Sequence, residues 1–161
     1  MTSNSSNKIG HVAIIMDGNS RWARQRNLKT IEGHKQGVNR LRDIVKYSAK
    51  SEITHLSVFA FSTENWKRSA SDVSDLMKLF LQSIIKEVPE LIENKVQLNF
   101  IGDISRFSKS LVSQINSAMK DTQAKKPNLN LNVAISYGGR WDILNAIKRM
   151  KDHKIKIDKL N

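Results

Sequence analysis

The chain has 161 residues, no cysteine and a formal net charge of +12, from 27 Lys and Arg against 15 Asp and Glu. This composition excludes disulfides, thiolate metal sites and a thiol nucleophile, and the length favours one domain over residues 1–161. No apolar run is long enough to span a membrane, and the polar segment 1–8 lacks the apolar core of a secretory signal. We therefore expect a soluble, cytoplasmic domain with a disordered tail over residues 1–8.

Four short apolar runs rich in β-branched residues alternate with longer helical patterns. The runs are HVAIIM (11–16), LSVFAF (56–61), VQLNFI (96–101) and LNLNVAI (129–135). Apolar residues at three- and four-residue spacing predict helices over 39–49, from 73 onward, around 111–119 and around 143–150. This alternation predicts an α/β fold with a mainly parallel sheet flanked by helices.

The helix that starts near Val73 has the clearest pattern. Its apolar residues form one broad stripe (Val73, Leu76, Met77, Phe80, Ile84, Ile85, Val88 and Leu91). The residues from Ser69 to Asp72 resemble an N-terminal capping box. Pro89 lacks a backbone donor and is expected to kink the helix or end it.

Polar residues gather in the segments that follow the four apolar runs. Ligands of open α/β sheets bind outside the carboxyl ends of the strands, so a site is expected in these segments. The segments are DGNSRW (17–22), STENWKR (62–68), GDISR (102–106) and SYGGRWD (136–142). Each carries an arginine, and together they hold all three tryptophans. This shared composition is stronger evidence for a site than any single residue.

The first of these loops has the composition of a diphosphate site. Asp17, a Gly-Asn turn and a helix that opens near Ser20 would combine a carboxylate with free N–H groups at a helix N-terminus. Arg21 would add a charge-assisted donor, and Asp17 would hold Mg²⁺ on the phosphates. The alternative is an ordinary Asp-Gly turn that caps a helix.

The other candidates also have structural alternatives. In the second loop, Ser62, Asn65 and Arg68 offer ligand contacts, but Asn65 is as readily explained by local hydrogen bonding, with Trp66 in the core. His34 has no metal-ligand spacing with the other histidines, so it is either an ordinary histidine or a ligand contact. The motifs of P-loops, dinucleotide-binding folds, serine hydrolases and zinc proteases are missing from the sequence.

Five segments together resemble one family. HVAIIMDGNSRWA, GHKQG, FAFSTENWKR, IGDISRF and ISYGGRWDI are similar, in order and spacing, to cis-prenyltransferases (isoprenyl transferases, undecaprenyl diphosphate synthases). The resemblance runs from about Ile9 to Met150. It implies head-to-tail condensation of isopentenyl diphosphate with an allylic diphosphate, usually farnesyl diphosphate, to a cis-polyprenyl diphosphate that is delivered to a membrane. It also implies a homodimer that is cytoplasmic or peripheral to the membrane.

The same resemblance assigns roles to residues. Asp17 would be catalytic and the Mg²⁺ ligand, and Asn65 would be catalytic as a proton acceptor. Substrate binding would fall to Gly18, Asn19, Ser20, Arg21, Trp22, His34, Ser62, Thr63, Glu64, Trp66 and Arg68. Fixed cations and donors at these positions would favour ionisation of the allylic diphosphate. The helix from Val73 would form a wall of the tunnel for the growing chain.

The sequence departs from the family pattern in two places. Thr30 stands where the family usually has an arginine, and neighbouring Lys29 offers a charge but no bidentate fork. The C-terminal signature RxxGExRxSxF is absent, and with it contacts to isopentenyl diphosphate, a second Mg²⁺ carboxylate and much of the dimer interface. We therefore expect the N-terminal two thirds of the family fold without its last strands, and exposed apolar surface that promotes aggregation.

Three functions are compatible with these observations. The first is Mg²⁺-dependent prenyl transfer, and the second is a catalytically dead fragment or a binding module that keeps only the allylic diphosphate half-site. The third is nucleic-acid binding, which the positive charge alone suggests. Because the basic residues are scattered and no nucleic-acid-binding motif is present, no nucleic-acid partner is expected.

Overall fold

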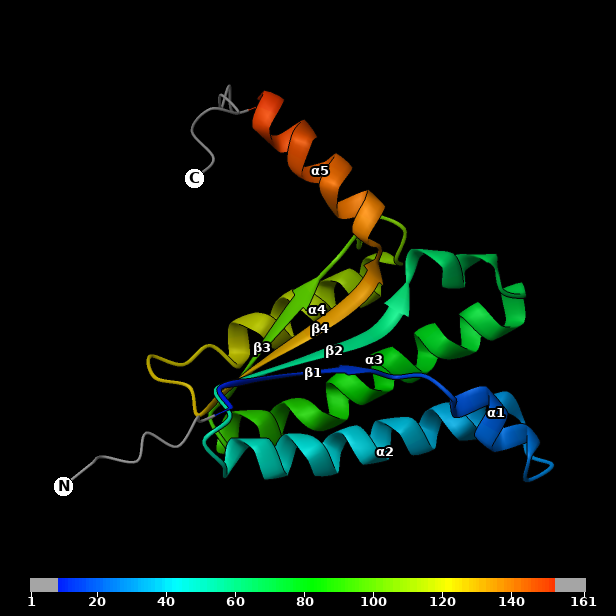
Figure 1. Ribbon diagram of the computed structural model, residues 1–161, viewed down its shortest axis with the longest axis horizontal. Coiled ribbons are helices and arrows are strands. Elements are labelled where there is room, and N and C mark those ends of the chain that lie inside the picture. Colours follow the sequence, from blue (N-terminus) through cyan, green and yellow to red (C-terminus); the bar gives the residue numbers. More distant parts are fainter. Residues whose placement is uncertain (1–8, 153–161) are drawn as a thin grey trace.

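A computed structural model describes residues 9–152, so the predicted tail over residues 1–8 and the basic residues after Asp152 lie outside the described residues. Its strands are β1 (His11–Ile15), β2 (His55–Ser62), β3 (Val96–Ile101) and β4 (Leu129–Tyr137). Its helices are α1 (Asn19–Arg24), α2 (Thr30–Ala49), α3 (Ala70–Glu93), α4 (Lys109–Asp121) and α5 (Gly139–Asp152), with the 3-10 helix η1 (Thr63–Lys67) after β2. The predicted α/β fold is confirmed (Figure 1).

The four strands form one sheet in the order β1-β2-β4-β3, and every neighbouring pair is parallel. In the register, Ala13 lies beside Ser57, Ser57 beside Asn132, and Asn132 beside Asn99. Because the strands are parallel, their carboxyl ends all lie at the same end of the sheet. The four candidate loops follow these ends and therefore lie near one another. The expectation of a mainly parallel sheet is therefore met by all three strand pairs of the described sheet.

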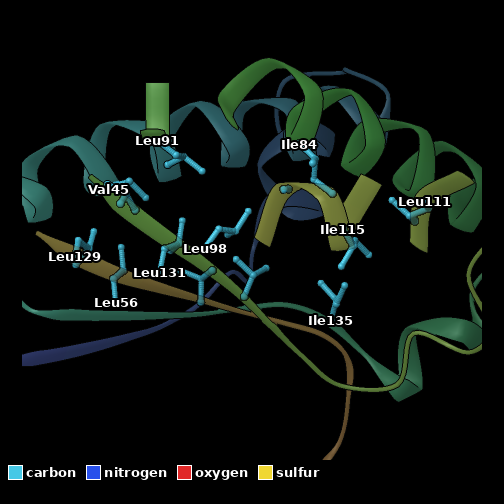
Figure 2. Close-up of a cluster of buried hydrophobic side chains, with 14 residues drawn as sticks. Val45, Leu56, Ile84, Leu91, Leu98, Leu111, Ile115, Leu129, Leu131 and Ile135 are labelled. Atoms are coloured by element: carbon cyan, nitrogen blue, oxygen red, sulfur yellow. The ribbon is translucent and has the colours of Figure 1, made fainter. Parts of the chain in front are cut away.

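One face of the sheet carries the core, and α2, α3 and α4 cover it. Figure 2 shows Val45, Ile84, Leu91 and Ile115 pointing from these helices toward the strands. The strands contribute the alternate side chains of that face: Leu56, Val58, Val96, Leu98, Leu129, Leu131, Val133 and Ile135. Burial of each such side chain contributes about 1.5–3 kcal/mol, so this face fixes the register of the strands.

The opposite face of the sheet is polar at its centre. Asn99 Nδ2 donates to Asn132 Oδ1 (3.2 Å), and Asn132 Nδ2 donates to Ser57 Oγ (3.3 Å). His11 Nε2 lies 2.9 Å from the same Ser57 oxygen. These contacts cross all four strands in a single line. The two faces of the sheet therefore differ in chemistry as well as in coverage.

The ends of the long helices differ in part from expectation. Ser69 caps α3 as predicted, since its Oγ accepts from the Asp72 amide (3.1 Å). Pro89 does not end α3, which continues to Glu93. The last turn is held beyond the proline because the backbone N–H and the side-chain Nδ2 of Asn94 both donate to the Glu90 carbonyl. None of the helices within residues 9–152 is long and apolar enough to span a bilayer.

Large apolar side chains remain exposed, as the sequence predicted. On β1, an edge strand of the sheet in residues 9–152, the exposed fraction of Ile15 is 78%. On α5 it is 64% for Ile143, 59% for Leu144 and 57% for Ile147. This helix buries none of its residues and extends away from the sheet in Figure 1. Aggregation through these side chains stays a prediction.

We expect the protein to self-associate, and the Ile143→Lys/Ile147→Lys variant to reduce this, because two charges interrupt the apolar side of α5. Sedimentation velocity over a range of concentrations measures the effect. Asn145→Lys on the same helix is the control, since it adds a charge outside the Ile143–Ile147 stripe. A wild-type protein that stays monomeric and unfolds cooperatively at every concentration contradicts the prediction.

Candidate active site

A cavity of about 330 Å³ opens near the carboxyl ends of β1 and β2 and runs between the sheet, α2 and α3. Six of the predicted site residues line it: Asp17, Asn19, His34, Ser62, Asn65 and Arg68. The other seven do not line it: Gly18, Ser20, Arg21, Trp22, Thr63, Glu64 and Trp66. The first loop, helix α2 and the second loop, which are distant in sequence, thus meet at the opening of the cavity.

Asp17 is held at the start of the first loop. Its carboxylate accepts from the backbone N–H of Gly18 and, at 3.1 Å, from Arg21 Nη2. Gly18 adopts a left-handed conformation (φ 86°), which glycine reaches without strain, and precedes α1 without a side-chain cap. The side chains of Asp17 and Arg21 are 78% and 68% exposed, so the pair is accessible to a ligand. The loop therefore presents a carboxylate, a guanidinium and an uncapped helix end together.

Glycines of α2 let the first loop approach this helix closely. A Cβ atom on Gly33 would lie 2.0 Å from the carbonyl oxygen of Asn19, and one on Gly37 would lie 2.7 Å from its Oδ1. Gly33 and Gly37 are one helical turn apart and so face the same side of α2. Asn19 is thereby packed against α2, which explains why the segment GHKQG accompanies the first loop. Lys29 and Thr30, where the family pattern is broken, stand at the beginning of the same helix.

We expect Gly33→Ala to lower the free energy of unfolding by about 1–3 kcal/mol, the usual effect of overpacking, because the new methyl group collides with backbone. Urea denaturation measures the change. Gly139→Ala is the matched control, since a Cβ at Gly139 meets nothing within 4 Å. Equal stability of the two variants would show that α1 and α2 are not closely packed.

His34 faces the cavity with an unsatisfied ring nitrogen. Within residues 9–152, its Nε2 is the buried side-chain polar atom that has no hydrogen-bond partner. Burial lowers the pKa of His34, and the charge of Arg68 lowers it further, while Asp72 acts in the opposite direction. The imidazole is therefore favoured in its neutral form, with Nε2 available to a ligand in the cavity.

The lowered pKa predicts that His34 makes stability depend on pH. The unfolded chain, in which the histidine pKa is about 6.5, binds the proton more tightly than the folded chain. The contribution of His34 is therefore complete above about pH 6.5 and is lost as the pH falls through its lower folded pKa. Urea denaturation at pH 7.5 and 5 should show this loss in the wild type and less of it in His34→Gln. An unchanged pH profile in His34→Gln, compared with the exposed-site control His55→Gln, contradicts the assignment.

The second loop is fixed by two reciprocal hydrogen bonds. Asn65 Oδ1 accepts from the backbone N–H of Ser62 (3.0 Å), and Ser62 Oγ accepts from that of Asn65 (3.3 Å). This capping box begins η1, so the local alternative foreseen for Asn65 is present. Asn65 also lines the cavity. The capping box fixes the conformation of the loop that carries its side-chain N–H groups.

Trp66 does not line the cavity. Its side chain packs against neighbouring aromatic rings and so holds this loop in place. Its ring contacts Phe61 and Phe107, with centroids 5.1 and 5.6 Å away, and the Arg106 guanidinium lies 4.3 Å above it. Its Nε1 donates to the buried Ser136 Oγ (2.9 Å). The loop after β3 and the end of β4 thus hold the loop after β2. Trp22 is similarly covered by a guanidinium, that of Arg26 at 4.4 Å.

Similarity to known proteins agrees with this geometry. The sequence family described as "Putative undecaprenyl diphosphate synthase" matches residues 15–161. This chain belongs to that family. A ditrans,polycis-undecaprenyl-diphosphate synthase ((2E,6E)-farnesyl-diphosphate specific) from Pasteurella multocida is 45% identical, over 94% of this chain and 64% of the relative. An isoprenyl transferase from Nitrosomonas europaea is 48% identical, over 87% of this chain and 53% of the relative.

Solved structures of related enzymes have the same fold as this family member. The crystal structure of lavandulyl diphosphate synthase from Lavandula x intermedia, in complex with dimethylallyl diphosphate, superposes with a TM-score of 0.86 at 34% identity. A probable undecaprenyl diphosphate synthase from Campylobacter jejuni gives 0.77 at 30% identity. Each comparison covers 66% of the solved chain. The chain thus spans about half to two thirds of the length of these relatives.

The family member has one carboxylate suited to Mg²⁺ at the cavity opening. Within residues 9–152 no group of three or more acidic or histidine side chains is placed to hold a metal ion. Mg²⁺ often takes one or two carboxylates and completes its coordination with substrate phosphates and water. The exposed carboxylate of Asp17 fits that pattern when a diphosphate supplies the other oxygens.

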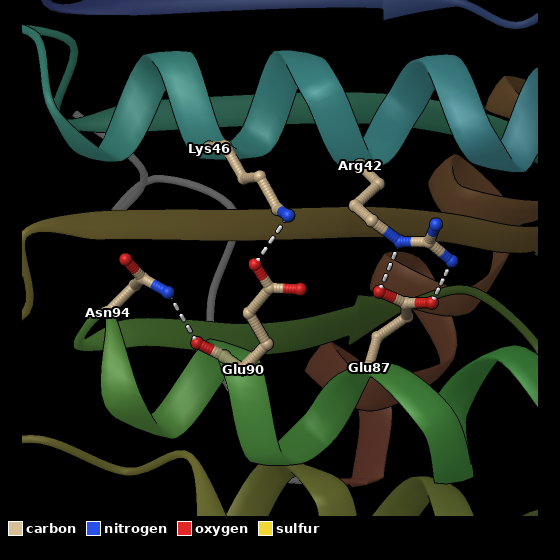
Figure 3. A network of polar contacts seen from close by, with 5 residues as sticks. All are labelled: Arg42, Lys46, Glu87, Glu90 and Asn94. Atoms are coloured by element: carbon tan, nitrogen blue, oxygen red, sulfur yellow. Dashed lines mark hydrogen bonds and ion pairs between the residues drawn. The ribbon is translucent and has the colours of Figure 1, made fainter.

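Apart from His34, the sequence did not identify the residues of α2 that line the cavity. Besides apolar Val38, Leu41 and Val45, the lining includes the charged Arg42 and Lys46. Facing them from α3 are Glu87 and Glu90, which also belong to the lining and pair with these cations (Figure 3). The available signal was the pairing of two cations one turn apart on one helix with two carboxylates at similar spacing on another.

Proposed function

We propose that this chain binds an allylic prenyl diphosphate, such as farnesyl diphosphate, and transfers the prenyl group to isopentenyl diphosphate to give a cis-polyprenyl diphosphate. One observation carries the proposal: a single cavity joins a polar opening at Asp17, His34 and Arg68 to an apolar interior between the sheet, α2 and α3. An amphipathic ligand with an anionic head and a hydrocarbon tail fits such a cavity. The family and the names of its relatives support the same class of ligand.

The residues at the opening suit the departure of a diphosphate. Negative charge grows on the diphosphate as its bond to the allylic carbon breaks, so donors and cations fixed at this place favour the transition state. His34 would donate from Nε2, and Arg68 and Arg21 would supply positive charge. Mg²⁺ held by Asp17 would neutralise part of the diphosphate charge. The apolar walls would keep water from the allylic cation.

Asn65 and the rest of the second loop would position the second substrate. The new carbon–carbon bond forms as isopentenyl diphosphate adds to the allylic carbon, and a proton then leaves the adduct. We assign Asn65 to that proton-transfer step, beside Ser62, Thr63 and Glu64 of the same loop. The capping box supports this role because it fixes the orientation of the Asn65 carboxamide. Family membership is also the support for a homodimer, for a cytoplasmic or membrane-peripheral location and for delivery of the product to a membrane.

The test is Mg²⁺-dependent incorporation of labelled isopentenyl diphosphate into farnesyl diphosphate by the 161-residue chain, with Asp17→Ala as the negative control. Product that depends on both Mg²⁺ and Asp17 is the expected result. Binding of farnesyl diphosphate without any product would instead identify a binding module that keeps the allylic half-site. Absence of binding by a folded chain would reject the proposed function altogether.

A further inference from the structure

The carboxylate of Asp17 lies against the backbone nitrogen of the next residue. Asp17 Oδ1 is 2.5 Å from the nitrogen of Gly18, which donates to it. Because the carboxylate carbon Cγ is bonded to that oxygen at about 1.23 Å, Cγ lies within about 3.8 Å of the same nitrogen. Reacting atoms that are poised to form a bond are about 3–3.5 Å apart. The two groups that can close a five-membered ring are thus already side by side.

Gly18 leaves its nitrogen open to such a reaction. Asp17–Gly18 is the only aspartate–glycine or asparagine–glycine pair in the sequence. Gly18 has no Cβ to shield the nitrogen, and its left-handed backbone places it just before α1. Within residues 9–152, its N–H donates to no main-chain carbonyl. The exposed side chain of Asp17 is also reached by water, which the second half of the reaction consumes.

We propose that Asp17 is a site of spontaneous isomerisation to isoaspartate in the empty protein, and that a diphosphate bound with Mg²⁺ suppresses the reaction. The Gly18 nitrogen forms a bond to Cγ, and a carboxylate oxygen leaves as water with the amide proton and one proton from solvent. Water then adds to the main-chain carbonyl of the succinimide ring, and the bond from this carbonyl to the Gly18 nitrogen breaks. The water that was lost is regained, so the product has the same mass and no oxidant or reductant is needed.

Isoaspartate would change the first loop in two ways. The main chain would run through Cγ and so be longer by one methylene group, while the free carboxylate would be attached directly to Cα. The next residue has no room to move toward α2, because the carbonyl oxygen of Asn19 lies 2.0 Å from the place of a Cβ on Gly33. The extra length therefore displaces the loop away from α2 and takes the carboxylate assigned to Mg²⁺ from its position at the cavity opening.

A bound ligand would oppose the first step of this reaction. A carboxylate that coordinates Mg²⁺ cannot turn its carbon toward the Gly18 nitrogen or release an oxygen as water. The empty site would therefore lose its carboxylate with time, and the occupied site would keep it. This protection rests on the proposed function, whereas the isomerisation itself depends only on Asp17, Gly18 and water.

The test is mass spectrometry of digests of the 161-residue chain after prolonged incubation at neutral pH, with fragment ions that report a main chain running through Cγ. Asp103 is the internal control, since this loop carboxylate accepts from the Ser105 amide and is followed by Ile104, whose Cβ shields the nitrogen. We expect residue 17 to isomerise at least about tenfold faster than residue 103, and farnesyl diphosphate with Mg²⁺ to slow residue 17 at least about tenfold. The isomerised fraction, separated by ion exchange, should bind farnesyl diphosphate at least about tenfold more weakly than the unmodified fraction.

Equal rates at Asp17 and Asp103 in the empty chain overturn the isomerisation and leave the proposed function standing. If the chain binds farnesyl diphosphate with Mg²⁺ but residue 17 still isomerises at the same rate, the protection is refuted. A chain that binds no farnesyl diphosphate rejects the proposed function and the protection together, and the comparison with Asp103 still decides the isomerisation. Equal binding by the isomerised and unmodified fractions would show that the position of this carboxylate has no part in the site.

Discussion

Replacement of Asp17 by alanine is expected to weaken Mg²⁺-dependent binding of farnesyl diphosphate by at least about a hundred-fold. Loss of groups that merely support a metal ligand costs 10–100-fold, and Asp17 is assigned as the ligand itself. Within residues 9–152, no group of three or more acidic or histidine side chains is placed to hold the metal ion in its stead. Titration calorimetry with Mg²⁺ and with EDTA measures the effect, and the variant should bind equally weakly under both conditions.

Asp17→Asn tests the charge of residue 17 separately from the conformation of the loop. The asparagine oxygen can still accept from the Gly18 amide, as the carboxylate does, but it carries no charge for a cation. Asp17→Asn should therefore resemble Asp17→Ala in binding while keeping the stability of the wild type. Asp43→Asn, which removes an exposed carboxylate of α2 outside the cavity, should leave binding unchanged. Mg²⁺-dependent binding that survives in Asp17→Asn contradicts the assignment of this residue.

The fold was largely predictable because apolar residues recur at different spacings in strands and in helices. All four apolar runs became strands within about two residues of the expected ends, since β2, β3 and β4 bury alternate side chains in the core and β1 packs half-buried ones against it. The apolar spacing indicates α2 only from residue 39, nine residues after its first residue, Thr30. The segment 30–38 carries two glycines in place of an apolar stripe, and its helix is explained by contact with α1, which no local pattern reveals.

The site was predictable in its location but not in the roles of its side chains. The rule that ligands bind beyond the carboxyl ends of parallel strands identified the correct edge of the sheet. It could not show that Asn65 lines the cavity while neighbouring Trp66 packs on Phe61, because a 3-10 turn decides which way each side chain points. The pairing of Arg42 with Glu87 was equally hidden, since 45 residues separate them and only the packing of two helices brings them together.

Phe61→Ala is expected to lower the free energy of unfolding by about 3–5 kcal/mol, a large part of the roughly 5–15 kcal/mol of an ordinary domain. Phe61 is 1% exposed and is among the largest fully buried side chains of residues 9–152. The alternation of β2 shifts by one residue before it, at an irregularity in the pairing with β4, and this shift buries Phe61. Urea denaturation followed by circular dichroism measures the loss. Tyr47→Ala, a control at a site that is 74% exposed, should change stability by no more than about 0.5 kcal/mol.

Phe61→Ala should also weaken ligand binding, because the ring of Phe61 packs against the ring of Trp66. Without that contact, Trp66 and the loop from Ser62 to Arg68 lose their fixed position, and the donors of this loop no longer converge on the cavity opening. Phe61→Leu keeps most of the buried volume and should recover most of the stability but less of the binding, since a leucine offers no ring face to Trp66. Full recovery of both by leucine would mean that the aromatic contact has no part in positioning the loop. Because Phe61 also lines the cavity, recovery of stability alone would show that this side chain serves the site as well as the core.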